Sequence, residues 1–374
     1  MRIVHYIPQL IDNDLLSNYL RTVTKALEEK VSVSIITYDN RKDMLTQACP
    51  DIIHIHSCWD YTTARLAKQM AKRGAAVILS PHGALDTYSY RHEQPIMKHL
   101  RSLLYLRSTT KNTDAVIVTT EQEEQEVLRL NWQKRIGVIK NALLDSTTTA
   151  AMMADDLIRF YQKVIDSRYY TLMSSKEKEG ICSLLREGVT DDTFSDPISQ
   201  SQRDLLSSIS DTQWRRMLLY ADDEDIRRHI DKAILRLQLT TPAINTEAID
   251  RFMTRHPKAK GLLAGTNNDA RLQRETTAEE RSLRVICSML LSAHHHVESG
   301  TLSMNHLADL YTHLKYEDYD EDRLKELTKE LGIYRFAQSI VQLLIEDMQL
   351  EEGFQPLKPR NGRDTRKLRT LLIH

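Results

Sequence analysis

The sequence predicts an α/β protein: a Rossmann-like doubly wound parallel sheet domain in residues 1–145, followed by a mostly α-helical domain in residues 146–374. Three observations support this fold class. Short runs rich in Val and Ile alternate with longer helix-forming runs in the first domain, as in a parallel sheet with crossover helices. Beyond residue 145 the apolar residues recur at helical spacing. Glycine, which Rossmann-type phosphate turns require, is scarce, with 11 in the whole chain.

The predicted strands are short and apolar on both faces, which is typical of a buried parallel sheet. In chain order they are Ile3–Ile7, Val31–Thr37, Ile52–His56, Ala76–Ser80, Ala115–Thr119 and Ile136–Lys140. The helices predicted between them are Leu15–Glu29, Tyr61–Arg73, Pro95–Arg107 and Glu121–Asn131. Pro95 suits the first turn of its helix, and Gly74 suits a C-terminal cap.

The second domain is predicted to be helical throughout. Its apolar residues repeat three or four positions apart, for example at Ile226, Ile230 and Ile234, and no strand is followed by a glycine turn. A break near residues 257–269 would divide this domain into two sub-parts.

Composition narrows the function classes. The formal net charge is −1, so no global field recruits nucleic acid, and no nucleic-acid partner is predicted. No apolar stretch approaches the roughly 20 residues of a membrane span, and the amino terminus predicts a strand instead of a signal peptide. The four cysteines are scattered, as in a reduced compartment. We therefore expect a cytoplasmic protein.

No metal site is predicted. The run His294-His295-His296 is the obvious candidate, but adjacent helical residues point about 100° apart, so three such rings cannot easily bind one ion. A solvated helix end is the preferred interpretation of this run.

Polar residues lie at the carboxyl ends of three of the predicted strands: His56-Ser57, His82-Gly83 and Thr120-Glu121. In an open parallel sheet, ligands bind outside the carboxyl ends of the strands, where these residues should lie. A glycine beside His82 would let backbone and ligand approach closely. His54 lies inside its strand, where a core histidine with satisfied hydrogen bonds is the simpler interpretation.

In order and spacing, Asp51–Ser57, Ser80–Asp86, Ala115–Glu121 and Ile136–Asn141 resemble the N-terminal domain of family 4 glycosyltransferases of the GT-B type. In that family a DIIHxH strand, a PHG loop, a T..E junction and a VIPNG exit recur. The resemblance implies that His82 is the catalytic residue, hydrogen-bonding the transferred sugar or the acceptor. Their position at the strand ends, in the same place as the site of that family, makes His56, Ser57, Gly83, Thr120 and Glu121 the predicted substrate-binding residues. For Thr120 and Glu121 a helix cap is the more frequent explanation.

The sequence also departs from the family. The loop after the first strand, Pro8–Leu15, has no glycine, and its Asp12 and Asp14 would repel a donor pyrophosphate at the helix N-terminus. The exit Lys140-Asn141-Ala142 lacks the family's proline and glycine. Residues 146–374 contain no recognisable donor-binding domain, and Glu352-Gly353-Phe354 is only a fragment of its motif.

Two functions therefore remain open. The first is a glycosyltransferase-like protein that moves a sugar from a nucleotide-sugar donor to a glycan or lipid-linked acceptor in polysaccharide biosynthesis. If active, the resemblance implies retention of configuration, no metal and no cofactor besides the donor. The alternative is a non-catalytic, degenerate glycosyltransferase that acts as a binding, scaffold or regulatory protein.

Three further contacts are hypotheses. The helical domain could bind a partner protein. The basic amphipathic helix Pro95–Arg107 and the basic tail Lys358–Arg369 could contact the inner face of the membrane peripherally. A core-packing face and an ordinary solvated C-terminus are the commoner explanations of these two segments.

Overall fold

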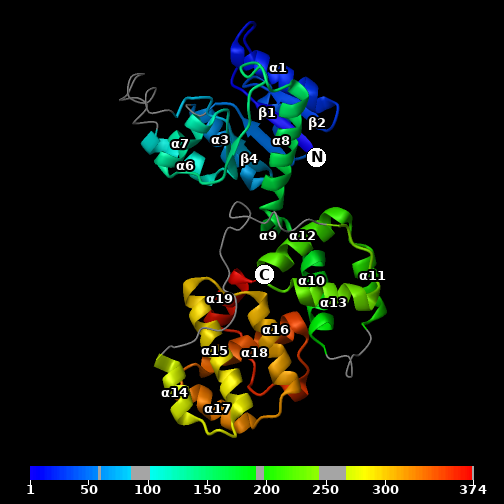
Figure 1. The fold of residues 1–374 in the computed structure, drawn as a ribbon, viewed down its shortest axis with the longest axis vertical. Coiled ribbons are helices and arrows are strands. Elements are labelled where there is room, and N and C mark those ends of the chain that lie inside the picture. The colour runs from blue at the N-terminus through cyan, green and yellow to red at the C-terminus, as the bar shows by residue number, and fades with distance from the viewer. Residues whose placement is uncertain (58–59, 86–101, 191–197, 244–266, 373–374) are drawn as a thin grey trace. The chain divides into compact units, whose positions relative to one another are not determined.

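The computed structural model describes residues 1–57, 60–85, 102–190, 198–243 and 267–372. The chain divides into two compact units, Met1–Arg168 and Tyr169–His374 (Figure 1). The first unit continues past residue 145 because helix α8, Ala150–Asp166, packs against helix α1, Leu15–Glu28.

The first unit is built on a six-stranded parallel sheet of order β2-β1-β3-β4-β5-β6. Its strands are β1 Arg2–Tyr6, β2 Ser32–Ile36, β3 Ile52–Ile55, β4 Ala76–Leu79, β5 Ala115–Val118 and β6 Ile136–Val138. The chain passes from β1 outward to β2 and then returns past β1 to β3. The direction of strand addition thus reverses between β1 and β3, and such a switch point is where open sheets bind ligands.

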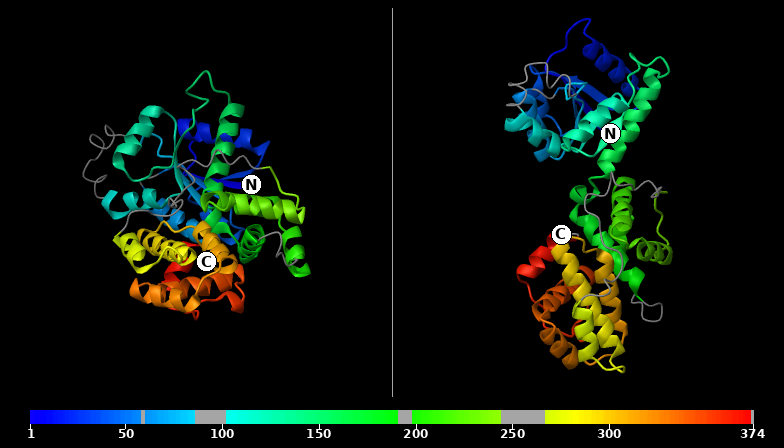
Figure 2. Two further views of the ribbon diagram at one scale, coloured as in Figure 1. Left: turned by 60° about the horizontal axis from the view of Figure 1, so that its bottom comes forward. Right: turned by 60° about the vertical axis from the view of Figure 1, so that its left-hand side comes forward.

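Helices cover both faces of this sheet (Figure 2). Besides α1 and α8 they are α2 Arg41–Thr46, α3 Tyr61–Lys72, the π-helix η1 Ser102–Leu106, α6 Arg107–Asn112 and α7 Glu121–Leu130. Side chains of α2, α3, η1 and α7 form one hydrophobic cluster with Val4, Tyr6, Ile53 and Ile55 of the sheet. Because side chains alternate along a strand, the residues between these project to the opposite face, where α1 and α8 lie.

The structure confirms the predicted doubly wound parallel sheet and corrects its details. Burial on both faces holds for the inner strands but is wrong at the two edges. Ser32 and Ser34 of β2 are exposed because an edge strand has a neighbour on one side only. The six-residue helix α2 was not predicted, since it is too short for a periodic pattern. Residues 95–101 of the predicted helix Pro95–Arg107 lie outside the described residues.

The Gly74 cap is confirmed. Gly74 follows α3 with φ of 100°, and the amide of Ala75 donates to the carbonyl of Met70, which closes the helix end.

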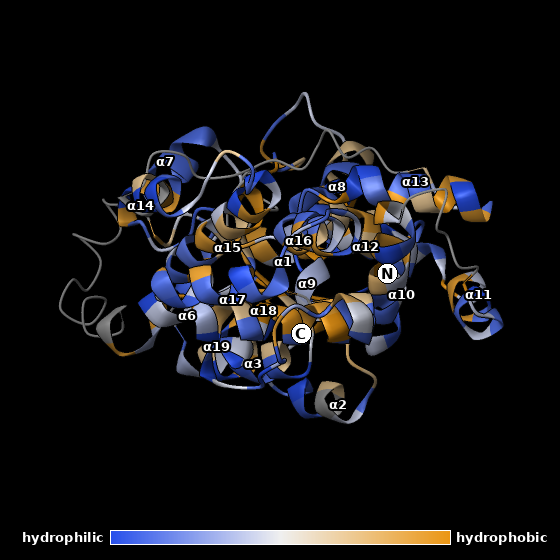
Figure 3. Ribbon diagram, turned by 90° about the horizontal axis from the view of Figure 1, so that it is seen from below, coloured by the Kyte–Doolittle hydropathy of each residue, from blue (hydrophilic) through white to orange (hydrophobic). Residues whose placement is uncertain are grey.

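In the described part of the second unit every regular element is a helix, which confirms the predicted helical domain. They are α9 Tyr169–Leu172, α10 Ser175–Val189, α11 Gln200–Ser207, α12 Asp211–Asp223, α13 Arg227–Leu237, α14 Asn267–Glu275, α15 Arg281–Ser299, α16 Met304–Tyr316, α17 Glu321–Glu330, α18 Tyr334–Met348, the 3-10 turn η2 Glu352–Phe354 and α19 Arg363–Leu371. Hydrophobic and hydrophilic residues alternate along these helices (Figure 3).

One hydrophobic cluster runs through the second unit from Tyr169 to Leu372. The predicted break near residues 257–269 falls mostly outside the described residues, and helices on both sides of it contribute to this cluster. The basic tail is not free, because α19 packs against α18 and Arg369 pairs with Glu346. None of the helices that the structure describes has the length and apolar character needed to cross a membrane.

Candidate functional site

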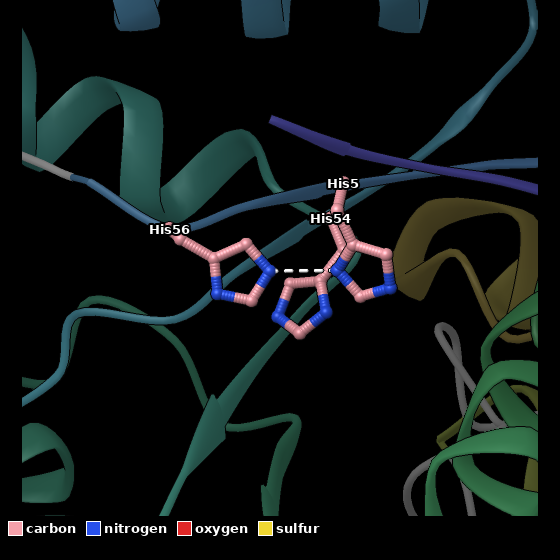
Figure 4. A group of neighbouring side chains, drawn as sticks. All are labelled: His5, His54 and His56. Carbon is pink, nitrogen blue, oxygen red and sulfur yellow. Dashed lines mark hydrogen bonds between the residues drawn. The ribbon is translucent and has the colours of Figure 1, made fainter. Parts of the chain in front are cut away.

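Four histidines gather at the carboxyl edge of the sheet, at its switch point. His5 comes from β1, His54 from β3, His56 directly follows β3, and His82 follows β4. His5 and His54 are direct neighbours in the register of β1 and β3. His54 and His56 are two residues apart and project to the same face, where Figure 4 shows them beside His5.

Three of the rings are hydrogen-bonded in a row. His5 Nδ1 lies 2.8 Å from His56 Nε2, and His56 Nδ1 lies 2.9 Å from His82 Nε2. The stacked ring planes are inclined by 27° for the first pair and 22° for the second. Tyr19 of α1 meets the rings of His56 and His82 edge-on. The row thus leads from the buried strand β1 to His82, which is partly exposed.

His54 is bonded outside this row. Its Nε2 lies 2.7 Å from Ser80 Oγ, and its Nδ1 lies 2.7 Å from the hydroxyl of Tyr161 in α8. Because the Ser80 hydroxyl donates to the carbonyl of Ile117, Ser80 must accept from His54. The proton of His54 is therefore on Nε2, and Nδ1 accepts from Tyr161. The prediction that His54 is a satisfied core histidine is confirmed.

Burial sets the charge of this cluster. Removal from water lowers the pKa of His5 to about 3 and that of His82 to about 4. The pKa values of His54 and His56 are also held well below the ordinary value, first by burial and then by the neighbouring imidazoles. All four rings are uncharged at neutral pH, so they offer hydrogen bonds without a formal charge.

A carboxylate holds the turn that carries His82. His82 and Gly83 have φ values of 50° and 77°, in the left-handed region that is uncommon for a residue with a side chain. The Gly83 amide donates to Glu123 Oε1 at 2.6 Å, while Glu123 Oε2 accepts from the Thr119 amide at 3.0 Å. Glu123 therefore ties the loop after β4 to the junction between β5 and α7.

The structure separates the predicted substrate-binding residues. His56 is buried within the imidazole row, Ser57 and Gly83 are partly exposed beside it, and His82 ends the row. Thr120 instead caps α7, accepting from the Glu123 amide, and Glu121 is exposed. Contact of any of these residues with a substrate stays a prediction.

Sequence reasoning missed His5, Tyr19, Tyr161 and Glu123. Two signals could have found some of them. His5 lies near the carboxyl end of one strand as His56 lies just past the end of another, and Glu123 lies three residues after the cap Thr120, as in a capping box. Tyr19 and Tyr161 reach the cluster only through tertiary packing.

Three of the histidines have a spacing relevant to metals. One ring nitrogen from each of His5, His54 and His56 lies within 4.8 Å of the others. No metal site was predicted here. Both nitrogens of His54 and both of His56 already have hydrogen-bond partners, so an ion would have to displace several of these bonds.

The histidine run of the second unit is dispersed. His294 packs edge-on against Phe336, His295 is exposed, and His296 is buried with Nδ1 bonded to Thr301 Oγ1 at 2.9 Å. The interpretation of this run as a solvated helix end is wrong for His296, because this end of α15 packs against α16, where the ring centroid of His296 lies 4.9 Å from that of His306.

The loop between β1 and α1 is arranged without a phosphate-binding turn. Asp14 is the N-cap of α1 and accepts from the Ser17 amide at 2.9 Å, and Asp12 pairs with Arg21 at 2.7 Å. The carboxylate of Asp14 occupies the helix N-terminus, where a diphosphate would otherwise be stabilised.

A separate hollow of about 600 Å³ lies between α3 and α6. Tyr61, Lys68 and Tyr105 are among the residues that line it. It is on the face of the sheet opposite the histidines and does not include them.

Residues 17–142 match the family described as a glycosyl transferase 4-like domain. No curated protein and no solved structure matches the chain. The matched segment contains three of the four histidines and Glu123, and it ends before α8.

Proposed function

We propose, from the match of residues 17–142 to a glycosyl transferase 4-like domain, that the first unit binds a sugar ligand at the histidine edge and that the protein transfers a glycosyl group. The donor is a nucleotide sugar, and the acceptor is a glycan or lipid-linked hydroxyl in polysaccharide biosynthesis. The observation that carries this proposal is the row of uncharged imidazoles at the switch point of the matched domain.

The chemistry of the edge supports recognition of hydroxyl groups. In a transfer, the bond from the anomeric carbon to the diphosphate oxygen breaks, a bond to the acceptor oxygen forms, and the acceptor's proton is released. A neutral imidazole at His82 can hydrogen-bond a sugar hydroxyl during this step. The departing diphosphate also needs positive charge or amide donors, and the four uncharged imidazoles supply no positive charge.

Turnover of nucleotide sugars tests this proposal. The purified full chain is incubated with UDP-, GDP- and ADP-sugars, with and without glycan and lipid-linked acceptors, and release of nucleoside diphosphate is measured. We expect release with at least one donor and a loss of about 100-fold in His82→Ala, since removing one positioned hydrogen-bond donor from an active site costs about 10²–10³ in kcat. The exposed His295→Ala serves as control. No release with any donor removes the catalytic function.

A second function is favoured by a specific observation. The described residues of the second unit contain no strand, and Asp14 closes the α1 N-terminus of the first unit. We therefore propose, as the alternative function, a non-catalytic protein that binds a glycan at the histidine edge and a partner protein through its helices. Saturable glycan binding that His82→Ala abolishes, with no turnover of any donor, would identify this function.

We also propose a cytoplasmic location with peripheral contact to an anionic membrane face. The exposed basic residues Arg363, Arg366 and Lys367 of α19 support this contact. The test is co-sedimentation with vesicles containing phosphatidylglycerol. We expect binding that weakens with salt and is lost when all three residues are changed to Glu. Equal binding by this triple variant would contradict the contact.

A further inference from the structure

The row of three imidazoles constrains where its protons are. Each of its two contacts, His5 Nδ1 to His56 Nε2 and His56 Nδ1 to His82 Nε2, requires one ring to donate and the other to accept. Burial keeps all three pKa values below neutrality, so each ring has a single proton at pH 7. Only two arrangements then satisfy both contacts.

In the first arrangement every ring is protonated on Nδ1. His5 donates to His56, His56 donates to His82, and the N–H of His82 Nδ1 is left for another partner. In the second arrangement every ring is protonated on Nε2, and donation runs in the opposite direction. His82 Nδ1 then has a lone pair, and His5 Nε2 has an N–H.

The buried end of the row distinguishes the two. His5 is fully buried, and its Nε2 has no hydrogen-bond partner among the described residues. The second arrangement would bury an unpaired N–H at this nitrogen, whereas the first buries only an unused lone pair. Among buried backbone groups, N–H donors without a partner are rarer than under-satisfied acceptors, and we infer the same order for the N–H and the lone pair of an imidazole nitrogen. The first arrangement is therefore favoured.

We propose that His5 and His56 are positioning residues that hold the proton of His82 on Nδ1, so that His82 presents an N–H donor to an oxygen of the bound ligand. That the ligand oxygen belongs to a sugar or an acceptor hydroxyl rests on the proposed function. The position of the proton does not. Because His82 Nε2 is bonded to His56, Nδ1 is the ring nitrogen left for a ligand.

This arrangement excludes one role for His82. With its proton on Nδ1 and its Nε2 occupied, the ring has no lone pair available to accept a proton from an acceptor hydroxyl. His82 could become a general base only if all three protons moved along the row, which would place the unpaired N–H on His5. The geometry assigns it to hydrogen-bond donation instead.

Metal binding is the competing explanation of the cluster. His5, His54 and His56 have one ring nitrogen each within 4.8 Å of the others. An ion held there would take the lone pairs that now accept hydrogen bonds from Tyr161 and along the row. Metal binding and the hydrogen-bonded row therefore predict different protonation states for the rings.

Long-range ¹H–¹⁵N correlation spectra of the full chain, labelled with ¹⁵N-histidine, measure these protons directly. At pH 7 we expect His5, His56 and His82 to be neutral with the proton on Nδ1, and His54 to be neutral with the proton on Nε2. The spectrum of the unchanged protein decides the question. Single histidine variants serve only for assignment among the 14 histidines.

Two substitutions of His5 test whether it controls His82. His5→Asn keeps an amide donor near the position of Nδ1 and should keep His82 protonated on Nδ1. His5→Leu removes the donor and should raise the Nε2-protonated fraction of His82 severalfold. His54→Asn is the matched control, since His54 is equally buried but lies outside the row, and it should leave His82 unchanged.

Several results would overturn the proposal: a proton on Nε2 of His82 in the unchanged protein, a charged His82 at pH 7, no response of His82 to His5→Leu, or histidine signals of a bound metal that chelator removes. A His82 protonated on Nδ1 in a protein that binds no sugar ligand supports the proton arrangement and removes the proposed function. The two failures can therefore be told apart.

Discussion

At the scale of single residues, the buried histidines make the first unit sensitive to acid. The pKa of His5 is lowered to about 3 and that of His82 to about 4, from an ordinary value of 6.5. At pH values between 6.5 and these lowered pKa values, each of the two histidines is protonated in the unfolded chain but not in the native chain. Stability is therefore complete above pH 6.5 and is lost as the pH falls, by up to about 1.4 kcal/mol per pH unit for each such histidine.

This acid sensitivity is measured by urea unfolding between pH 7 and 4.5, with fluorescence in a Trp214→Phe background that reports on the first unit. We expect the free energy of unfolding to decrease as the pH is lowered. In His5→Asn the decrease per pH unit should be smaller, because one buried histidine no longer contributes. His295→Asn, at an exposed position of the second unit, is the control. A slope that is unchanged in His5→Asn would contradict the role of burial.

Glu123 gives the second prediction at this scale. Its carboxylate accepts from the Gly83 and Thr119 amides, so Glu123→Gln removes one acceptor from a buried position. We expect a loss of about 1–3 kcal/mol in the free energy of unfolding and faster hydrogen exchange at Gly83. Glu121→Gln in the same helical turn is exposed and should change stability by less than about 0.5 kcal/mol. Equal effects of the two variants would contradict the clamp.

At the scale of elements, the alternation of Val-rich and helical runs was sufficient to predict the sheet and most of its helices. The edge strand β2 shows the limit, because the exposure of Ser32 and Ser34 depends on strand order, which the local pattern does not contain. The candidate site was predicted in part. His56 and His82 follow strands and could be found, whereas Tyr161 reaches His54 across 107 residues of sequence.

Two glycines of α10 test the packing of the second unit. A Cβ at Gly188 would lie 2.0 Å from the backbone oxygen of His229 in α13. Because this distance is too short for two non-bonded atoms, Gly188→Ala requires the backbone of α10 or α13 to shift. At Gly180 the nearest atom is the flexible end of Met217, at 3.0 Å. We expect Gly188→Ala to cost about 1–3 kcal/mol or more, and Gly180→Ala to stay within about 1 kcal/mol because helix propensity improves.

Thermal unfolding of the two variants, followed by circular dichroism, checks this pair. Both substitutions lie in one helix and change glycine to alanine, so helix propensity alone would stabilise both. A Gly188→Ala protein as stable as Gly180→Ala would show that α10 and α13 do not approach as closely as described.

At the scale of the whole molecule, the unit boundary predicts which fragment folds. Met153, Leu157, Tyr161 and Val164 of α8 are fully buried in the first unit. Burial of four such side chains contributes on the order of 8 kcal/mol, comparable to the entire stability of an ordinary domain. We expect residues 1–168 to unfold cooperatively and residues 1–149 to remain unfolded. Cooperative unfolding of the shorter fragment would contradict the placement of α8.

Binding of a sugar ligand at the histidine edge is the claim on which both proposed functions depend. The most direct measurement is titration of the ¹⁵N-histidine-labelled full chain with UDP-, GDP- and ADP-sugars and with oligosaccharides. We predict a saturable shift of the His82 and His56 signals with at least one ligand and no shift of His295. The absence of a saturable shift at all four clustered histidines with every ligand would contradict the account.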